Sequence, residues 1–128
     1  MVRKTVGRVL VMVLVAAAGL LVSTQAAQAF TRSEFCEREG LSISYFADNK
    51  TYLGRATFHW YAGYHTIDIY DAEPRDGAVM SARVDFGGGD VREFYTFARI
   101  DEDVYKWRAV WNGYASRWYP EDNCYPQD

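Results

Sequence analysis

The sequence predicts an all-β domain, a seven-stranded antiparallel meander that forms a small sandwich or a barrel-like fold. Two observations carry this prediction. After Gly40, β-branched and aromatic residues alternate with polar residues, and turn residues recur roughly every ten positions. Two cysteines, Cys36 and Cys124, lie near the two ends of the predicted strands. A disulfide between them suits a closed barrel, whereas an odd number of strands argues against simple closure, so both forms stay open.

The first 29 residues have the pattern of a secretory signal peptide. A basic start precedes an apolar run from Val9 to Val22, and the small-residue segment Ala27-Gln28-Ala29 follows it. We expect cleavage after Ala29, which leaves residues 30–128 as a single secreted, extracellular β domain. That domain has no second apolar run long enough for membrane insertion.

Composition narrows the classes of partner that this domain can have. Without Arg3, Lys4 and Arg8, eleven of the fourteen basic residues remain against all seventeen acidic ones, so the net charge is near −6. A negative protein repels phosphates at long range, which disfavours nucleic acid as a partner. All 21 aromatic residues follow the leader, and this density excludes a disordered chain.

In an exported chain, the pair Cys36 and Cys124 predicts one structural disulfide. Both histidines, His59 and His65, are far from the cysteines in sequence, so we expect neither a metal site nor another cofactor.

A short helical segment is expected before the strands. Thr31 and Glu34 have the spacing of a capping box, which predicts one or two helical turns between Thr31 and Glu39. The seven predicted strands then cover residues 41–46, 51–61, 64–71, 78–86, 91–100, 104–111 and 114–119.

The hairpin between the second and third strands has the turn Ala62-Gly63. A two-residue turn there pairs Tyr61 with Tyr64 and His59 with Thr66. The same register gathers one apolar face from three strands, formed by Leu41, Ile43, Tyr45, Ala56, Phe58, Trp60, Ile67 and Ile69.

In the second half of the meander, the expected cross-strand pairing follows from the positions of three turns. Asn112-Gly113 predicts a type I′ hairpin, which pairs Trp111 with Tyr114 and Trp107 with Trp118. A four-residue loop at 87–90 pairs Phe86 with Val91, and the link 101–103 joins the fifth and sixth strands. The expected inner face contains Ala78, Met80, Ala82, Val84, Phe86, Tyr95, Phe97, Tyr105, Trp107, Ala109 and Trp111.

The outer face of the last four strands is the candidate ligand site. Its predicted members are Arg83, Arg92, Lys106, Arg108, Arg117, Phe94 and Tyr119. The register sets Arg108 opposite Arg117, a like-charge pair that costs stability unless an anion lies nearby. An alternative interpretation is a solvated face whose arginines reach acidic loop residues such as Asp101 and Asp103.

Two smaller groups of polar residues are weaker candidates for a functional site. Glu93, Arg99 and Ser116 interrupt the inner face, either as rim residues or as the polar part of a ligand cavity. His59 lies diagonal to Asp68 on an outer face, but no nucleophile stands beside this pair, and we assign no catalytic residue.

The leading hypothesis is a non-catalytic extracellular binding module for an anionic or carbohydrate-type ligand, such as an anionic polysaccharide, or for an extracellular protein. The alternative is a proteinaceous inhibitor of a secreted hydrolase, which would use the hairpin tip 111–114 and the loop 72–77. A small secreted hydrolase is the third hypothesis.

Overall fold

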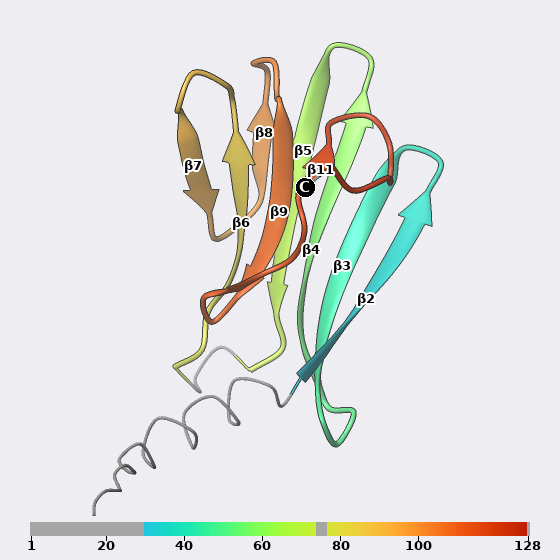
Figure 1. The fold of residues 1–128 in the computed structure, drawn as a ribbon, viewed down its shortest axis with the longest axis vertical. Helices are drawn as coiled ribbons and strands as arrows, with labels where there is room; N and C mark the ends of the chain where they lie inside the picture. The colour runs from blue at the N-terminus through green and yellow to red at the C-terminus, as the bar shows by residue number, and fades with distance from the viewer. Residues whose placement is uncertain (1–29, 74–76, 128) are drawn as a thin grey trace, which may run out of the picture. The chain divides into compact units, whose positions relative to one another are not determined.

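Ten β-strands and no helix form the part of the chain that a computed structural model describes, residues 30–73 and 77–127 (Figure 1). The first sheet has the order β2-β3-β4-β5-β8. Its strands are β2 (Phe30–Glu37), β3 (Gly40–Ala47), β4 (Tyr52–Tyr61), β5 (Tyr64–Asp71) and β8 (Ala98–Ile100). The second sheet has the order β10-β9-β6-β7, and β11 also pairs with β9. Its strands are β6 (Met80–Asp85), β7 (Val91–Phe94), β9 (Lys106–Trp111), β10 (Tyr114–Ala115) and β11 (Tyr119–Pro120).

Every strand pair whose register is described is antiparallel, so the predicted all-β antiparallel class is confirmed. The predicted signal peptide, residues 1–29, lies outside the described residues, as do positions 74–76 of the predicted 72–77 loop. Within the described ranges, no helix is both long and apolar enough to cross a membrane.

The first sheet follows the predicted register closely. Tyr61 pairs with Tyr64 and His59 with Thr66, because Gly63 takes the positive φ of 91° that a tight two-residue turn requires. The predicted apolar face is buried on three strands through Leu41, Ile43, Tyr45, Ala56, Phe58 and Ile67.

The predicted N-terminal helix is wrong, because this segment is the edge strand β2. Its side chains alternate with a period of two, and Arg32, Glu34 and Cys36 each reach a residue more than eighty positions away. These long-range contacts override the local capping signal. Their partners are the carbonyl of Ala115, the hydroxyl of Tyr119 and the sulfur of Cys124.

The seven-stranded meander is also wrong in its second half. The predicted strand 91–100 is divided into β7, which pairs with β6, and β8, which pairs with β5 in the other sheet. Strand β9 then pairs with β6 instead of continuing a hairpin from the preceding strand. Tyr95 and Phe97, expected in the core, lie at this crossing and are 59 % and 60 % exposed, and Tyr105 is equally exposed at 59 %.

A one-residue change of register at the glycine loop has the largest consequence for the candidate site. Val91 pairs with Asp85 rather than with Phe86, whose amide instead donates to the Asp90 carbonyl across 2.8 Å. The loop therefore holds five residues, 86–90, instead of four. Because adjacent side chains point to opposite faces of a strand, this shift exchanges the two faces of β7.

The two sheets share one core. The ring of Phe58 on β4 stacks on Trp107 of β9, with centroids 5.3 Å apart and planes 13° apart. The hydroxyl of Tyr45 donates to the carbonyl of Tyr114 across 2.7 Å, which ties β3 to β10. A Cβ added at Gly54 would lie 3.2 Å from Met80, so the sheets also approach closely there.

Candidate functional site

Three of the seven predicted ligand residues share the outer face of the β6–β9 pair. Arg83 is the direct cross-strand partner of Arg108, and Asp85 is the partner of Lys106. Directly opposed residues project to the same side of a sheet, so three basic side chains lie together there. We use the name basic face for Arg83, Lys106, Arg108 and Trp118, the last of which is described next.

Trp118 is a member of the basic face that the sequence did not predict. The Nζ of Lys106 lies 4.7 Å from the centroid of its ring and the Cζ of Arg108 lies 4.3 Å from it, within cation–π range. The predicted register placed Trp118 opposite Trp107, but Tyr119 occupies that position. One extra residue between β10 and β11 causes the difference and moves the indole to the outer face.

The predicted opposition of Arg108 and Arg117 is wrong for the same reason. The Nε of Arg108 donates instead to the carbonyl of Ser116 across 2.9 Å, and Arg117 is an exposed residue of the segment before β11. A like-charge pair does exist in this sheet, but Arg83 is the partner of Arg108 in it.

The other predicted members leave the basic face. Arg92 is bound by Asp90 and Glu102, with an N–O distance of 2.8 Å to each, and its guanidinium lies over Phe86. Its hydrogen bonds hold the pKa of both carboxyl groups below the usual range. Phe94 pairs with Ala82 of the core, which places it on the inner side of the sheet.

Tyr119 is a core residue rather than a ligand residue. Its ring is 1 % exposed and its hydroxyl donates to Glu34 of β2 across 2.6 Å. Burial raises the pKa of this phenol well above its ordinary value, and the adjacent Glu34 carboxylate raises it further. Burial also raises the pKa of Tyr45.

Tyr119→Phe should therefore change the stability of the protein in a pH-dependent way. At neutral pH the lost hydrogen bond to the Glu34 carboxylate should cost about 1.5–3 kcal/mol, the range for bonds to charged groups. The raised pKa stabilises the folded state fully below the unfolded pKa near 10, and this contribution is lost as the pH rises from 10 toward the folded pKa. Urea titrations at pH 7 and at alkaline pH measure the free energy of unfolding of both proteins. Between these two pH values the variant should lose less stability than the wild type. Equal losses would contradict the assignment of Tyr119 as a buried phenol with a raised pKa.

Glu93 lies on the outer face, whereas the sequence predicted it inside. The hydroxyl of Ser81, which is 1 % exposed, donates to one carboxylate oxygen across 2.5 Å, and the Nε of Arg83 lies 3.3 Å from the other. The same residues line an open groove of about 290 Å³. Its lining residues are Val79, Ser81, Arg83, Glu93, Tyr95, Val110, Asn112 and Gly113.

The other two polar residues that were predicted inside do not form a ligand cavity with Glu93. Arg99 is 58 % exposed, binds Asp101 across 2.9 Å and lies over the ring of Tyr64. Ser116 is buried, but its hydroxyl is used by the amide of Ala109 and by a neighbouring carbonyl. The cavity interpretation of these three residues is therefore wrong.

In the described part of the chain, the contacts of the His59 ring are with residues other than Asp68. His59 does lie diagonal to Asp68 in the register, but its Nε2 is 4.0 Å from Glu37 and its ring stacks on Tyr61. Among residues 30–73 and 77–127, no group of three or more His, Cys, Asp or Glu side chains could hold a metal ion.

Two further cavities lie away from the basic face, and both are lined by Trp60 and Asp122. One, of about 490 Å³, adjoins the disulfide, and the other, of about 330 Å³, lies at the tip of the β4–β5 hairpin. In the second, His65 contacts Glu121 across 3.3 Å. Both cavities are rich in carboxylates, so they differ in charge from the basic face.

Comparison with protein-family models, with curated proteins and with solved structures finds no significant match to this chain.

The basic face combines two kinds of chemistry. Its guanidinium groups can form paired hydrogen bonds with a carboxylate, sulfate or phosphate. The adjoining groove offers an exposed aromatic ring, a carboxylate and an amide, which suit a ligand that also has hydroxyl groups.

Proposed function

We propose that this protein is a secreted, non-catalytic binding module that holds an anionic ligand on its basic face. The observation that carries the proposal is the direct opposition of Arg83 and Arg108 on β6 and β9. Like charges in this position destabilise a sheet, and an anion bound between them removes the repulsion. The secreted state is inferred from the predicted leader and from the disulfide, which persists in oxidising compartments.

The cations of the basic face are held in place before any ligand arrives. Trp118 packs against both Lys106 and Arg108, and the Ser116 carbonyl binds the Nε of Arg108. A side chain that is already ordered loses less conformational entropy on binding, so this packing favours affinity. Two acidic side chains, Asp85 and Glu93, are cross-strand partners of Lys106 and Arg83.

The proposal is tested with the double variant Arg83→Gln and Arg108→Gln. Each charge-assisted hydrogen bond contributes about 1.5–3 kcal/mol, so the variant should bind a polyanion matrix at least roughly tenfold more weakly. The measurement is retention on immobilised polygalacturonate and on heparin at increasing salt, because screening should weaken wild-type retention. Retention by the Arg83→Lys and Arg108→Lys double variant should fall in between, since lysine keeps the charge but not the paired bonds.

Arg99→Gln is the matched control. Arg99 is also an arginine that stacks on an aromatic ring and binds an acid, but it lies on β8 in the other sheet. This variant should be retained like the wild type. If wild-type protein is not retained on either matrix at low salt, or if Arg99→Gln loses as much retention as the double variant, the basic face is not the binding site.

A further inference from the structure

We infer that the ligand is a carboxylated polysaccharide, with about one carboxylate and several free hydroxyls per sugar, that extends from the basic face into the adjoining groove. This inference rests on the proposed function and adds the class of ligand. Its basis is the contrast between the basic face and the groove that begins at Arg83.

Arg83 belongs to both surfaces. It opposes Arg108 on one side and Glu93 of β7 on the other, because β6 lies between β9 and β7 (Figure 1). A polymer that places an acidic group at Arg83 and Arg108 therefore has its neighbouring sugar units beside Glu93. The groove is open to solvent, so the ligand can enter it from the surface.

Glu93 is a carboxylate held in a fixed position inside this path. Ser81 donates to one oxygen, Arg83 lies at the other, and the side chain remains 29 % exposed. An ionised carboxylate has about four acceptor positions, so two contacts leave acceptor capacity for a hydroxyl group of the ligand. Sugar hydroxyls donate such bonds, whereas a sulfate ester is fully ionised at neutral pH and has no hydrogen to donate.

The same carboxylate discriminates against dense polyanions. A chain with several sulfates per unit would bring negative charge close to both Glu93 and Asp85. A uronic-acid chain can place its single carboxylate at the arginines and present hydroxyls to Glu93. The sign and spacing of these charges thus favour sparse carboxylates over dense sulfates.

The rest of the groove suits the apolar and polar parts of a sugar ring. Tyr95 is 59 % exposed and offers an apolar ring face in the groove that Val79 and Val110 also line. Asn112 lines the hairpin end, and its amide both donates and accepts hydrogen bonds. The tyrosine ring can pack against the face of a sugar ring, and the polar groups can bind the hydroxyls at the edge of that sugar ring.

The test compares binding to polygalacturonate and heparin by isothermal titration calorimetry at one ionic strength. Wild-type protein should bind polygalacturonate more tightly than heparin. Glu93→Gln should reduce that preference about tenfold, by weakening polygalacturonate binding and strengthening heparin binding. Tyr95→Ala should weaken polygalacturonate binding, while Phe97→Ala, a matched control with 60 % exposure in the same segment but outside the groove, should not.

The outcomes separate this inference from the proposed function. Tighter wild-type binding to heparin, or an unchanged preference in a folded Glu93→Gln variant, overturns the carboxylated ligand and leaves the anion-binding module standing. Binding to neither polymer overturns both. Because Ser81 loses a charged acceptor in Glu93→Gln, a melting curve is recorded for each variant. If Glu93→Gln does not fold, the comparison of Tyr95→Ala with Phe97→Ala decides instead, since both side chains are exposed.

Discussion

Replacing Trp107 by alanine should lower the free energy of unfolding by about 3–5 kcal/mol, the range for large aromatic residues in cores. The side chain is fully buried on β9, stacks on Phe58 of the other sheet and contacts Tyr119. Its removal leaves a cavity between the two sheets that the rigid strands cannot close. A small domain has a total stability of about 5–15 kcal/mol, so this loss is a large part of it.

Trp107→Phe is the matched control, and it should cost less than the alanine variant, because most of the ring volume stays in the core. The indole Nε1 is buried without a hydrogen-bond partner in the described part of the chain, and phenylalanine removes this unsatisfied donor while it keeps an aromatic ring. Urea denaturation followed by circular dichroism measures both variants. A loss below 1 kcal/mol in the alanine variant would mean that Trp107 does not join the two sheets.

The part of the fold that the sequence could predict depends on two-residue turns. Gly63 and the Asn112-Gly113 pair, with φ values of 91°, 47° and 86°, define the turn length without ambiguity. Once the length of a turn is known, each cross-strand pair follows by counting for as long as both strands stay regular. This is why β4 and β5 match the predicted register at every position, and why Trp111 pairs with Tyr114 as predicted.

At the glycine loop, the register of the following strand could not be predicted by counting residues from the turn. Three consecutive glycines, Gly87 to Gly89, all have positive φ, and glycine permits several loops of nearly equal cost. The structure closes a loop of five residues, stabilised by a bond from the Gly87 amide to Asp85 across 2.7 Å. One residue more exchanges the faces of β7, which is why Glu93 was predicted inside and Arg92 outside.

The candidate site was predictable to the extent that its strands were regular. Lys106 and Arg108 are two positions apart on β9, so their common face follows from alternation alone, whereas Arg83 joins them through the pairing of β6 with β9. Trp118 was not predictable, because an irregular segment between β10 and β11 places it. Pairing of β9 with β6 was also not predictable, because it joins strands distant in sequence.

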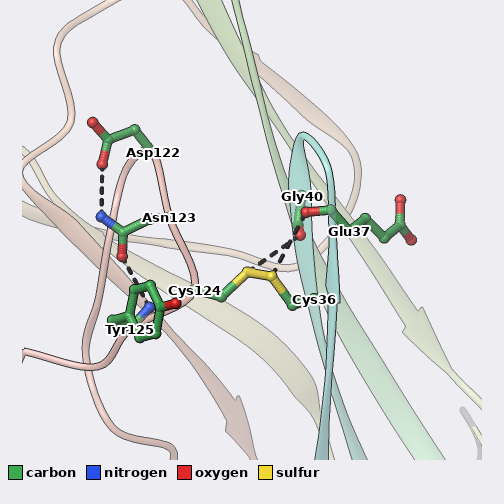
Figure 2. Close-up of a disulfide and its surroundings, with 7 residues drawn as sticks. All are labelled: Cys36, Glu37, Gly40, Asp122, Asn123, Cys124 and Tyr125. Atoms are coloured by element: carbon green, nitrogen blue, oxygen red, sulfur yellow. Dashed lines mark hydrogen bonds between the residues drawn. A yellow bond between two sulfur atoms is a disulfide. The ribbon is translucent and has the colours of Figure 1, made fainter.

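Removing the disulfide should lower the free energy of unfolding by about 2–5 kcal/mol, as in other small disulfide-bonded domains. Cys36 and Cys124 are bonded in the structure, as the sequence predicted, and 88 positions of the chain separate them (Figure 2). A link across so long a segment restricts the unfolded chain strongly. The test is the double variant Cys36→Ala and Cys124→Ala, compared with the wild type under non-reducing conditions by urea denaturation.

The size of the loss does not by itself say which state the disulfide acts on, and β2 provides the means to decide. If the bond acts mainly on the unfolded chain, the variant should unfold with a steeper dependence on urea, because its unfolded state exposes more surface. Strand β2 would still be docked through the Tyr119–Glu34 and Arg32–Ala115 bonds, and its amide hydrogens should exchange slowly relative to the loops. Fast exchange confined to β2 would show instead that the bond holds an edge strand whose side chains are otherwise largely exposed. A loss below 1 kcal/mol would contradict both accounts.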